Sequence, residues 1–582
     1  MKVGIDFGTS TSEIAYVDSN SKIIIIPNHL GEEITPSVVY IAKDGTPVVG
    51  REAREKALIE PENTFLEVKR LFGHESNLSA RGKTYSPVDV AAMIIRYLLD
   101  CARKHTGIPA DSAVITVPAY FTDAQRKDVM AAGIAAGITV DRIINEPTAA
   151  SLDYGIEHMR DCKYMLVYDL GGGTLDVTVL ELFEGVVEVK ASSGNNALGG
   201  KDFDQAIMDH IIAAVKKRDK TGASVDLDER AMMRIKIAAE QCKIALSKEN
   251  NFQIELPFLY SKNGQPAGYS ENISRFAFEA MIRGKIYSTA QQIKTVLFDA
   301  NLTADDIDLT LLVGGSTRIP LVSQFLEESF GLISESAVDP DLAVVRGAAI
   351  QAGVLSGVLS ENAIVLTDVC PYSLSTAALR VDWENSDDLY CDFLIRRNTT
   401  LPVAASKIYA TSYDFQTKVH ITAYQGESDD PKENYLLNTF ELSGIPKAKQ
   451  HKETINIQFE YDLNGILTIS AEIVSTGKSA VVTVNTSEMG KNLDLSKWKD
   501  TLNAKKYRQI INKAERLVKI HEEGEDNDQD EKNELIDGIK IAADNLKKAL
   551  VMDWEYSIVE KQRIFLEDAI DNFESFEGDE KP

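Results

Sequence analysis

The sequence predicts an α/β domain built from two similar halves, followed by an antiparallel β segment and a helical C-terminal segment. Three observations predict this order. One pattern of strand, Asp, Gly-Thr turn and strand occurs twice, and strand-like and helix-like apolar runs alternate up to about residue 362. Beyond that point the apolar spacing changes to period two and finally to helical spacing. At 582 residues the chain is long enough for several domains.

The repeated pattern begins near the amino terminus. In its first copy, VGIDFGTSTSEIAYV, an apolar strand ends in Asp6 and returns after a Gly8-Thr9 turn. In the second copy, YDLGGGTLDVTVLEL, Asp169 holds the equivalent place and three glycines follow it closely. One glycine-rich turn alone is equally compatible with a plain hairpin. A turn that only reversed the chain would not need an Asp twice, so we interpret the pattern as an internal duplication.

Each copy is followed by a second apolar strand that runs into a helix, at 113–121 and at 309–320. Gly314 and Gly315 lie at the second junction, where they let a ligand approach the backbone, and Pro320 is tolerated in a first helical turn. Amphipathic spacing predicts further helices, and these occupy 87–105, 122–137 and 231–247. Residues 1–362 are therefore expected to form one α/β domain.

The C-terminal third has a different character. Strict alternation from about 369 to 487, with an Asn-Gly turn at Gly465, predicts an antiparallel β unit. This unit carries no cluster of acid, base and nucleophile, which is typical of a binding domain. Three apolar faces with helical spacing follow, and we interpret them as helices that pack on one another. They are Leu502, Ile510, Ile511, Ala514, Leu517 and Val518; then Leu535, Ile536, Ile539, Leu546 and Leu550; then Ile558, Phe565, Leu566, Ala569, Ile570 and Phe573.

Composition excludes several classes of partner. The formal net charge of −27, with no basic stripe to offset it, argues against nucleic acid and against an anionic membrane surface. The five cysteines are scattered without metal or redox spacing, as expected for reduced thiols. No leader and no apolar run of membrane-spanning length is visible. We therefore expect a soluble, cytoplasmic protein.

The two Gly-Thr turns carry the chemistry of the first domain. Facing each other across a cleft, they would offer backbone N–H groups to a polyphosphate from both sides. Asp6 and Asp169, beside the turns, would then hold a hydrated Mg²⁺, an ion that prefers few carboxylates, several waters and phosphate oxygens. The segment GNNALGGKD lacks the spacing of a P-loop, and no GxGxxG opens a helix. The predicted ligand is a magnesium nucleotide.

Six segments resemble, in order, the signature segments of the 70-kDa heat-shock chaperones, the DnaK group: GIDFGTS, ITVPAYFTDAQRKD, RIINEPTAASLDYG, YDLGGGTLDVTVLE, LGGKDFD and LLVGGSTRIP. The resemblance continues through VLTDVCPYSL, RRNTTLPV and DLNGILTISA, so it covers essentially the whole chain. Among the branches of that family, the chain is most similar to the shortened bacterial HscC type, which shares the LTD-x-CPYSL junction.

The resemblance implies four parts: an actin-like ATPase domain of two duplicated lobes (1–362), a linker (363–368), a β-sandwich peptide-binding domain (369–487) and an α-helical lid (488–582). It implies a chaperone of protein folding and the stress response that binds extended apolar polypeptides. ATP binding would open the peptide site, and hydrolysis, stimulated by a J-domain partner, would close it. The chain between Gly73 and Pro87 is shorter than in most relatives, so an exchange factor is not necessarily required.

The resemblance also assigns residues to the nucleotide site. Lys69 would contact the γ-phosphate and the attacking water, while Glu146 and Asp176 would orient that water or the waters of the metal. A surface lysine is the simpler alternative for Lys69. The implied catalytic residues are Lys69, Glu146, Thr174 and Asp176. The implied nucleotide-binding residues are Gly8, Thr9, Ser10, Gly171, Gly172, Gly173, Thr174, Gly199, Gly200, Glu240, Lys243, Ser247, Gly314, Gly315, Ser316, Arg318 and Asp341, and the metal residues are Asp6 and Asp169.

Further residues are assigned to peptide binding and to coupling. The peptide site would comprise Thr376, Leu379, Tyr409, Ser412, Val419 and Ile421. Coupling between the domains would use Pro118, Arg126, Arg142 and Asp368. The chain departs from the family pattern at Lys201, which replaces a glutamate, at Thr367, which replaces a linker leucine, and in an enlarged loop at 380–393.

Two other classes share the actin-like fold. A small-molecule phosphotransferase such as a sugar kinase also has two phosphate hairpins, and fold alone does not fix function. A filament-forming cytoskeletal ATPase is the second alternative. Neither would need the roughly 215 C-terminal residues that follow the first domain here.

Overall fold

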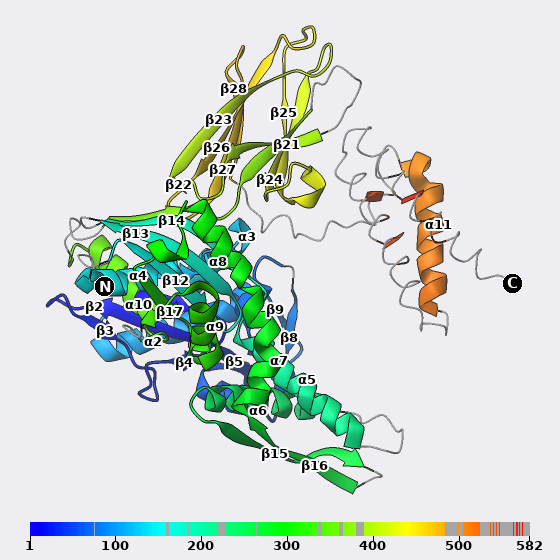
Figure 1. Ribbon diagram of the computed structural model, residues 1–582. Helices are drawn as coiled ribbons and strands as arrows, with labels where there is room; N and C mark the ends of the chain where they lie inside the picture. Colours follow the sequence, from blue (N-terminus) through cyan, green and yellow to red (C-terminus); the bar gives the residue numbers. More distant parts are fainter. Residues whose placement is uncertain are drawn as a thin grey trace. The chain divides into compact units, whose positions relative to one another are not determined.

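The computed structural model divides the chain into two compact units, Met1–Ser487 and Glu488–Pro582 (Figure 1). It describes residues 1–74, 76–158, 162–183, 186–218, 227–262, 265–335, 339–359, 365–379, 389–483, 499 and 504–523. It also describes the single positions 536, 539, 540, 543, 546, 547, 563, 566, 567, 570 and 573.

The first sheet has the strand order β11-β10-β1-β2-β3, and β4 pairs with β2. Its strands are β1 (Lys2–Phe7), β2 (Thr11–Val17), β3 (Ile23–Ile25), β4 (Thr35–Pro36), β10 (Ser112–Val117) and β11 (Thr139–Asn145). β1 and β2 form an antiparallel hairpin, while β10 runs parallel to β1 and β11 parallel to β10. The predicted strand–turn–strand pattern at Asp6 is therefore confirmed.

The second sheet has the order β18-β17-β12-β13-β14-β19-β22. Its strands are β12 (Tyr164–Leu170), β13 (Leu175–Phe183), β14 (Val186–Asn195), β17 (Leu309–Val313), β18 (Ser334–Glu335), β19 (Val365–Val369) and β22 (Thr400–Leu401). Its first five strands repeat the arrangement of the first sheet, since β12 and β13 form the hairpin and β17 runs parallel to β12. The same strand order thus occurs twice.

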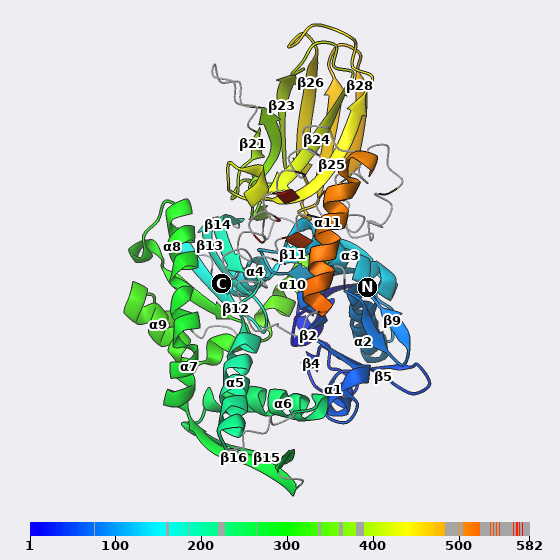
Figure 2. The ribbon, with the colours of Figure 1, turned by 90° about the vertical axis from the view of Figure 1, so that its right-hand side faces the viewer.

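Helices flank both sheets. Figure 2 shows α1 (Arg51–Ala57), α2 (Pro87–Thr106) and α3 (Asp123–Ala136) on one side, and α5 (Gly200–Arg218), α7 (Arg275–Ser288), α8 (Ala290–Asp299) and α9 (Pro320–Phe330) on the other. α6 (Glu229–Leu246) packs on α5. Capping boxes at Ser86 and Thr122 begin α2 and α3, and left-handed glycines end both helices. Pro320 opens α9, as predicted.

Two further helices pack against the first sheet and against each other, α4 (Glu146–His158) and α10 (Ala343–Leu355). Their contact is close, because a Cβ on Gly347 would lie 1.7 Å from the carbonyl oxygen of Ala149. Likewise, a Cβ on Gly4 of β1 would lie 2.2 Å from the backbone nitrogen of Ala349. Glycine is required at both positions, since any side chain would separate these elements.

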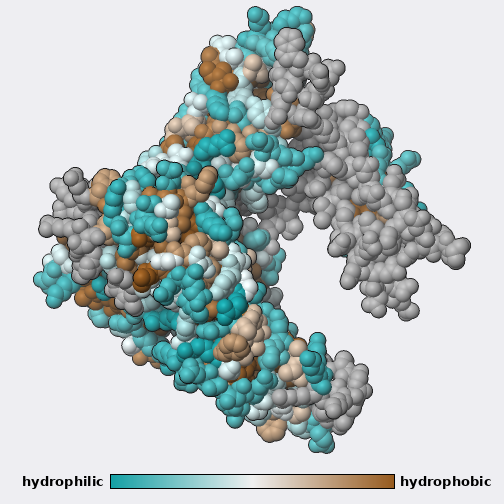
Figure 3. Space-filling model, viewed as in Figure 1, coloured by the Kyte–Doolittle hydropathy of each residue, from teal (hydrophilic) through white to brown (hydrophobic). Residues whose placement is uncertain are grey.

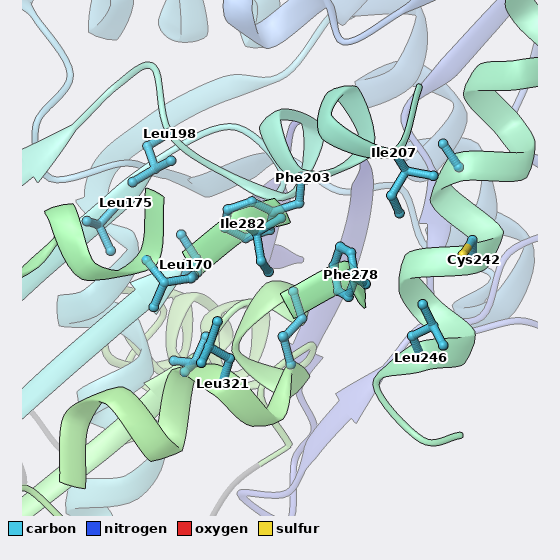
Figure 4. Packing of buried hydrophobic residues seen from close by; sticks show 14 of the residues in the cluster. Leu170, Leu175, Leu198, Phe203, Ile207, Cys242, Leu246, Phe278, Ile282 and Leu321 are labelled. Atoms are coloured by element: carbon cyan, nitrogen blue, oxygen red, sulfur yellow. The ribbon is translucent and has the colours of Figure 1, made fainter. Parts of the chain in front are cut away.

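Small sheets complete this part of the chain. β5 (Val38–Ile41) pairs with β6 (Pro47–Val49) and β7 (Thr64–Leu66), and β8 (Leu78–Ala80) pairs with β9 (Lys83–Tyr85). β15 (Asn251–Lys262) and β16 (Gln265–Ser274) form a hairpin that extends away from the large sheets (Figure 1). Figure 4 shows side chains from the second sheet and helices α5 to α7 and α9 meeting in one apolar core, among them Phe203, Cys242 and Phe278.

The period-two segment forms two four-stranded antiparallel sheets, β21-β20-β24-β25 and β23-β26-β27-β28. Their strands are β20 (Leu374–Leu379), β21 (Leu389–Ile395), β23 (Val403–Ala410), β24 (Lys418–Gln425), β25 (Tyr435–Ser443), β26 (Thr454–Tyr461), β27 (Leu467–Ile473) and β28 (Lys478–Thr483). Both sheets contribute to one core, which contains Ile421, Phe459 and Ile469. The antiparallel β unit is confirmed, including the turn at Gly465, where φ is 69°.

The second unit contains α11 (Ala504–Glu523). Its apolar face includes Ile511 and Ala514, as predicted. Side chains from the two later predicted faces join the same core, namely Ile536, Ile539, Leu546, Leu566, Ile570 and Phe573. Of the remaining predicted positions, Leu502, Leu535, Leu550, Ile558, Phe565 and Ala569 lie outside the described residues.

On the face shown in Figure 3, hydrophilic residues predominate and the apolar ones form small groups. All five cysteines are buried, and none is joined to another in a disulfide. Among the described helices, none is both long and apolar enough to cross a membrane.

Candidate functional site

The two glycine-rich turns face each other. A Cβ on Gly172 would lie 2.2 Å from the hydroxyl oxygen of Ser10, and a Cβ on Gly173 would lie 2.9 Å from that of Thr9. The second turn is closed by a hydrogen bond of 3.1 Å from the Gly171 N–H to the carbonyl oxygen of Thr174. Turns without side chains are therefore required here, because only they bring two backbones this close.

A third glycine pair supports the second turn from behind. A Cβ on Gly199 would lie 2.5 Å from the backbone nitrogen of Gly173. The Gly200 N–H donates to the carbonyl oxygen of Gly171 over 3.0 Å, and the Ser316 hydroxyl donates to the same oxygen over 2.9 Å. These bonds fix the shape of the turn before any ligand binds.

The turns lie in a cleft of about 900 Å³, a volume typical of ligand sites. Most of the predicted site residues line it: Asp6, Gly8, Thr9, Ser10, Lys69, Glu146, Asp169, Gly171, Gly172, Thr174, Glu240, Lys243, Ser247, Gly314, Gly315, Ser316, Arg318 and Asp341. They come from both sheets and from α4, α6 and the junction before α9. Segments far apart in the sequence thus meet around one space.

Lys69 is a buried cation in this cleft. Only 3% of its side chain is exposed, and its Nζ donates to Glu146 over 2.6 Å. It lies in a short 3-10 turn, Val68–Leu71, and its ammonium group also lies 5.8 Å and 5.5 Å from the ring centroids of Phe7 and Phe121. The alternative of a surface lysine is therefore excluded by its burial.

Several carboxylates are buried around Lys69. The pKa of Asp6 is raised to about 6, mainly by burial and then by the charge of Glu146, while Lys69 and a hydrogen bond from Thr116 oppose the rise. Burial and then the negative charge of Glu146 also raise the pKa of Asp169 well above its usual value. Each ionised group makes ionisation of the next more costly. The single ammonium group of Lys69 therefore does not offset the buried acids around it.

Asp6 and Asp169 fit a hard divalent cation. Among the described residues, no group of three or more His, Cys, Asp or Glu side chains is close enough to hold a metal directly. Two carboxylates that hold an ion largely through its waters remain compatible with this arrangement, and that is the binding mode Mg²⁺ prefers. An added cation would also lower the cost of ionising both groups.

The predicted adenosine residues also line the cleft. Glu240 and Lys243 are on α6, and Ser247 caps its C-terminus. Lys243 donates to the carbonyl oxygen of Gly200 over 3.0 Å, and Glu240 accepts from Arg54 over 2.5 Å. Arg318 is hydrogen-bonded to Asp341 over 2.7 Å. These residues are brought together with the glycine turns, as the resemblance implies.

Four predicted residues lie behind the cleft surface instead. Gly173, Gly199 and Gly200 are not among the described residues that line the cleft, and they act on its shape through the backbone. Asp176 is also outside the lining, only 1% exposed, and accepts a hydrogen bond of 3.0 Å from the Tyr120 N–H. Burial, and then Glu146, raise its pKa to about 7.

Glu13 belongs to the cleft but was not predicted. It lines the space from β2, directly opposite Asp6 in the hairpin register, and is 2% exposed. Burial, and then the charge of Asp6, raise its pKa well above the usual value. The register could have identified it, because a turn that pairs Phe7 with Ser12 also pairs the two acids.

The predicted coupling residues gather near β19. Arg126 donates to Asn145 over 2.7 Å, and Asn145 donates to Asp368 over 2.7 Å. Within the described chain, Asp368 forms no ion pair with Arg142. Burial raises the pKa of Asp368, and the positive charges of Arg126 and, to a smaller extent, Arg142 oppose that rise. Pro118 follows β10, one residue before Ala119, whose carbonyl oxygen accepts from Arg126.

The predicted peptide residues are divided between the two four-stranded sheets. Thr376, on β20, and Ile421, on β24, are each 2% exposed, whereas Leu379 is 41% exposed. Tyr409 lies on β23 of the other sheet and donates to Asp392 over 2.9 Å. Val419 packs against the shared core, and Ser412 is hydrogen-bonded to Gln416.

Paired glycine turns, a buried lysine and several buried carboxylates make this cleft a candidate nucleotide-binding site. A family model described as Hsp70 protein matches residues 2–80 and 75–579. The chaperone protein DnaK of Thermotoga petrophila is 42% identical over 486 residues, which cover 83% of this chain and 80% of that protein. The DnaK proteins of Thermosipho melanesiensis and Thermosipho africanus are 39% and 38% identical, with at least 92% of this chain and 90% of the relative covered.

The chain is thus of the class of ATP-dependent molecular chaperones, and it is an ATPase. It belongs to the Hsp70 family, because the family model spans nearly its whole length. The phosphotransferase alternative is not favoured, since the match includes the segments after the first domain, which a kinase would not need.

Proposed function

We propose that the protein binds ATP with Mg²⁺ in the cleft, hydrolyses it slowly, and uses the cycle to bind and release extended apolar polypeptide segments. The observation that carries the proposal is the pair of facing glycine turns with Lys69 buried between the lobes. We assign the actin-like ATPase domain to 1–362, the linker to 363–368, the β-sandwich peptide-binding domain to 369–487 and the helical lid to 488–582.

In this proposal the side chains divide the work at the γ-phosphate. Lys69 supplies positive charge where negative charge develops, and Glu146 holds that ammonium group in place over 2.6 Å. Thr9 and Thr174 contribute hydroxyl and backbone N–H groups to phosphate oxygens, and Asp176 orients the attacking water. A Mg²⁺ ion held by Asp6 and Asp169 would neutralise charge on the phosphates.

Contacts between the α/β part and the four-stranded sheets support the coupling. β19 pairs in parallel with β14, so the described part of the linker extends the second large sheet. The Ile143 N–H donates to Asn464 over 3.1 Å, and the Leu467 N–H donates to Asp123 over 3.2 Å. Because these contacts are direct, a conformational change in the α/β part would act on the sheets that would hold the peptide.

Partners follow from the same proposal. Unfolded or extended polypeptides are the expected clients, and a J-domain protein is the expected stimulator of hydrolysis. Spontaneous ADP release without an exchange factor stays a prediction, based on the short segment between Gly73 and Pro87. The HscC-type branch and a cytoplasmic location also stay predictions. Slow spontaneous release of ADP would contradict the prediction that no exchange factor is needed.

The test measures dissociation of a fluorescent, extended apolar peptide from the full-length protein, first in ADP and then in ATP. Release that is at least tenfold faster in ATP is expected if the cycle is coupled. Binding without an effect of ATP would show that the linker does not couple the domains. Absence of binding would contradict the assignment of residues 369–487 to peptide binding.

A further inference from the structure

The three carbonyl oxygens of the second glycine turn are each held by a donor outside the turn. Those of Gly171 and Gly172 accept from the backbone N–H groups of the first two residues of α5, over 3.0 Å and 2.9 Å. The carbonyl oxygen of Gly173 accepts instead from Nη2 of Arg70 over 3.0 Å. Arg70 belongs to the opposite half of the α/β part, since the 3-10 turn that carries it packs on α2 (Figure 2).

Arg70 is itself held at this place by a carboxylate. Its Nη2 also donates to Oδ2 of Asp202 over 2.7 Å, and the two side chains are only 26% and 23% exposed. The same oxygen of Asp202 accepts from the Gly199 N–H over 2.8 Å. Arg70 also packs closely on the turn, because its Nε would lie 2.9 Å from a Cβ on Gly173. The guanidinium group is thus fixed against the backbone of the turn.

The bond from Arg70 sets the direction of the next amide group. The peptide between Gly173 and Thr174 is trans, and a planar trans peptide directs its N–H opposite to its C=O. The N–H of Thr174 therefore points away from Arg70. Thr174 lines the cleft, whereas Gly173 is buried and Arg70 is not among the described residues of the lining. A side chain behind the cleft surface thus directs an amide group of that surface.

We propose that Arg70 is a positioning residue for phosphate binding: it holds the Gly173 carbonyl group so that the Thr174 N–H faces the nucleotide. Arg70 and the turn belong to opposite halves, so the turn has its binding shape only where the halves meet at this bond. Lys69, the neighbouring residue, reaches the nucleotide through the same approach of the halves. This inference rests on the nucleotide binding proposed above.

The test compares Arg70→Ala with the wild type in the full-length protein. Affinities for ATP and ADP, measured by titration with fluorescent nucleotides, should fall about tenfold, as expected when a hydrogen bond from a charged group is lost. The single-turnover rate at saturating ATP should stay within about threefold, because the Thr174 N–H would contact the bound ground state as well as the transition state. Lys69→Ala should give the reverse pattern, a lower rate at nearly unchanged affinity.

Arg70→Lys separates the hydrogen bond from the charge. Lysine keeps the positive charge, but its side chain ends one bond short of the position of Nη2, so affinity should be regained only in part. Wild-type affinity in Arg70→Lys would show that charge alone acts, and would overturn the inference. Arg103→Ala, at a side chain that is 61% exposed, is the control for loss of a positive charge and should leave affinity unchanged.

Asp202→Asn tests the same contact from its other side. It removes the charge that holds the guanidinium group but keeps an oxygen for the Gly199 N–H, so affinity should fall about threefold. The thermal midpoint without nucleotide shows whether Arg70→Ala folds, and if it does not, wild-type affinity in Asp202→Asn would overturn the inference.

The remaining outcomes separate this inference from the proposed function. If Arg70→Ala folds and binds ATP as tightly as the wild type does, the inference alone is overturned, whatever the rate of hydrolysis. If the wild-type protein itself binds neither ATP nor ADP, the proposed function is contradicted, and the inference falls with it.

Discussion

At the scale of single residues, the cleft combines one buried ammonium group with several buried acids. Lys69 is held by Glu146 and by two aromatic rings, so its ammonium group is in place before a nucleotide binds. Fixed charge in a site that excludes water stabilises a transition state without a cost of rearrangement at the moment of reaction. The same burial raises the pKa values of these acids, and a bound cation would oppose that rise.

Lys69→Ala should leave nucleotide affinity within about threefold of the wild type but lower the single-turnover rate of hydrolysis by about two orders of magnitude or more. The reason is that Lys69 would act on charge that develops only in the transition state. Rapid quenching with labelled ATP measures the rate, and equilibrium titration measures the affinity. Lys43→Ala, at an exposed lysine, serves as control. Hydrolysis at the wild-type rate would remove Lys69 from the mechanism.

Asp176→Asn should raise the free energy of unfolding of the protein without nucleotide or Mg²⁺, and more so at pH 8 than at pH 5.5. The pKa of Asp176 is about 7 in the folded protein, above its ordinary value of 3.8, so the folded state binds the proton more tightly. Stability from this group is therefore present below pH 4 and is lost as the pH rises through about 7. Asn never ionises, so its advantage should grow by about 1–2 kcal/mol between the two pH values.

Urea unfolding at both pH values measures this difference. Asp305→Asn, at an exposed carboxylate, is the control and should show no such growth. An advantage of Asp176→Asn that is equal at pH 5.5 and pH 8 would show that the carboxylate is ionised throughout this range.

At the scale of elements, the shape of the cleft depends on glycines that no ligand has to touch. Gly199 lies under the second turn, where its Cα is the largest group that fits below the backbone of Gly173. The turn itself is closed by its own hydrogen bond and supported by Gly200 and Ser316. A change beneath the turn is therefore expected to displace its N–H groups, although it adds nothing to the cleft itself.

Gly199→Ala should weaken ATP binding by about tenfold or more, because a Cβ would lie 2.5 Å from the Gly173 nitrogen and would push the turn into the cleft. Fluorescent nucleotide titration measures the effect. The matched control is Gly284→Ala in α7, where a Cβ meets nothing within 4 Å. That change should leave affinity unaltered and, in a helix interior, stabilise slightly. Equal affinities of the two variants would contradict the role given to Gly199.

The elements also show what sequence can predict. Both hairpins and the start of α9 could be predicted, because Asp, Gly and Pro act locally on the backbone. The hairpin register could place Glu13 opposite Asp6, but its burial could not be predicted, since burial depends on α10 packing against β2. The strand formed by Val365–Val369 depends on pairing with β14, about 180 residues away, and no local pattern records such a partner.

At the scale of the molecule, polar side chains take part in the contact between the α/β part and the four-stranded sheets within the unit Met1–Ser487. Asp299, at the end of α8, accepts hydrogen bonds from Arg397 over 2.8 Å and from Asn398 over 2.9 Å. The side chain of Asn398 accepts one more from the Ser192 N–H over 3.2 Å. Polar contacts of this kind can form and break in a cycle more easily than a large apolar interface.

Asp299→Ala should therefore reduce the acceleration of peptide release by ATP at least threefold, while release in ADP stays near the wild-type rate. The aspartate is only 10% exposed, so its loss leaves two donors of the sheet segment without their partner in the joined arrangement. That arrangement becomes less stable relative to a separated one, and ATP has less effect on the peptide site.

Dissociation of a fluorescent apolar peptide in ADP and in ATP measures this ratio for each variant. Asp305→Ala, six residues further along the chain and exposed, removes the same charge without touching the contact and should retain the full ratio. Asp299→Asn keeps one acceptor oxygen, so its ratio of release rates in ATP and ADP should lie between those of Asp299→Ala and Asp305→Ala. If Asp299→Ala kept the full ratio, the polar contact at α8 would have no part in coupling, and the linker strand β19 would have to carry the signal through its pairing with β14.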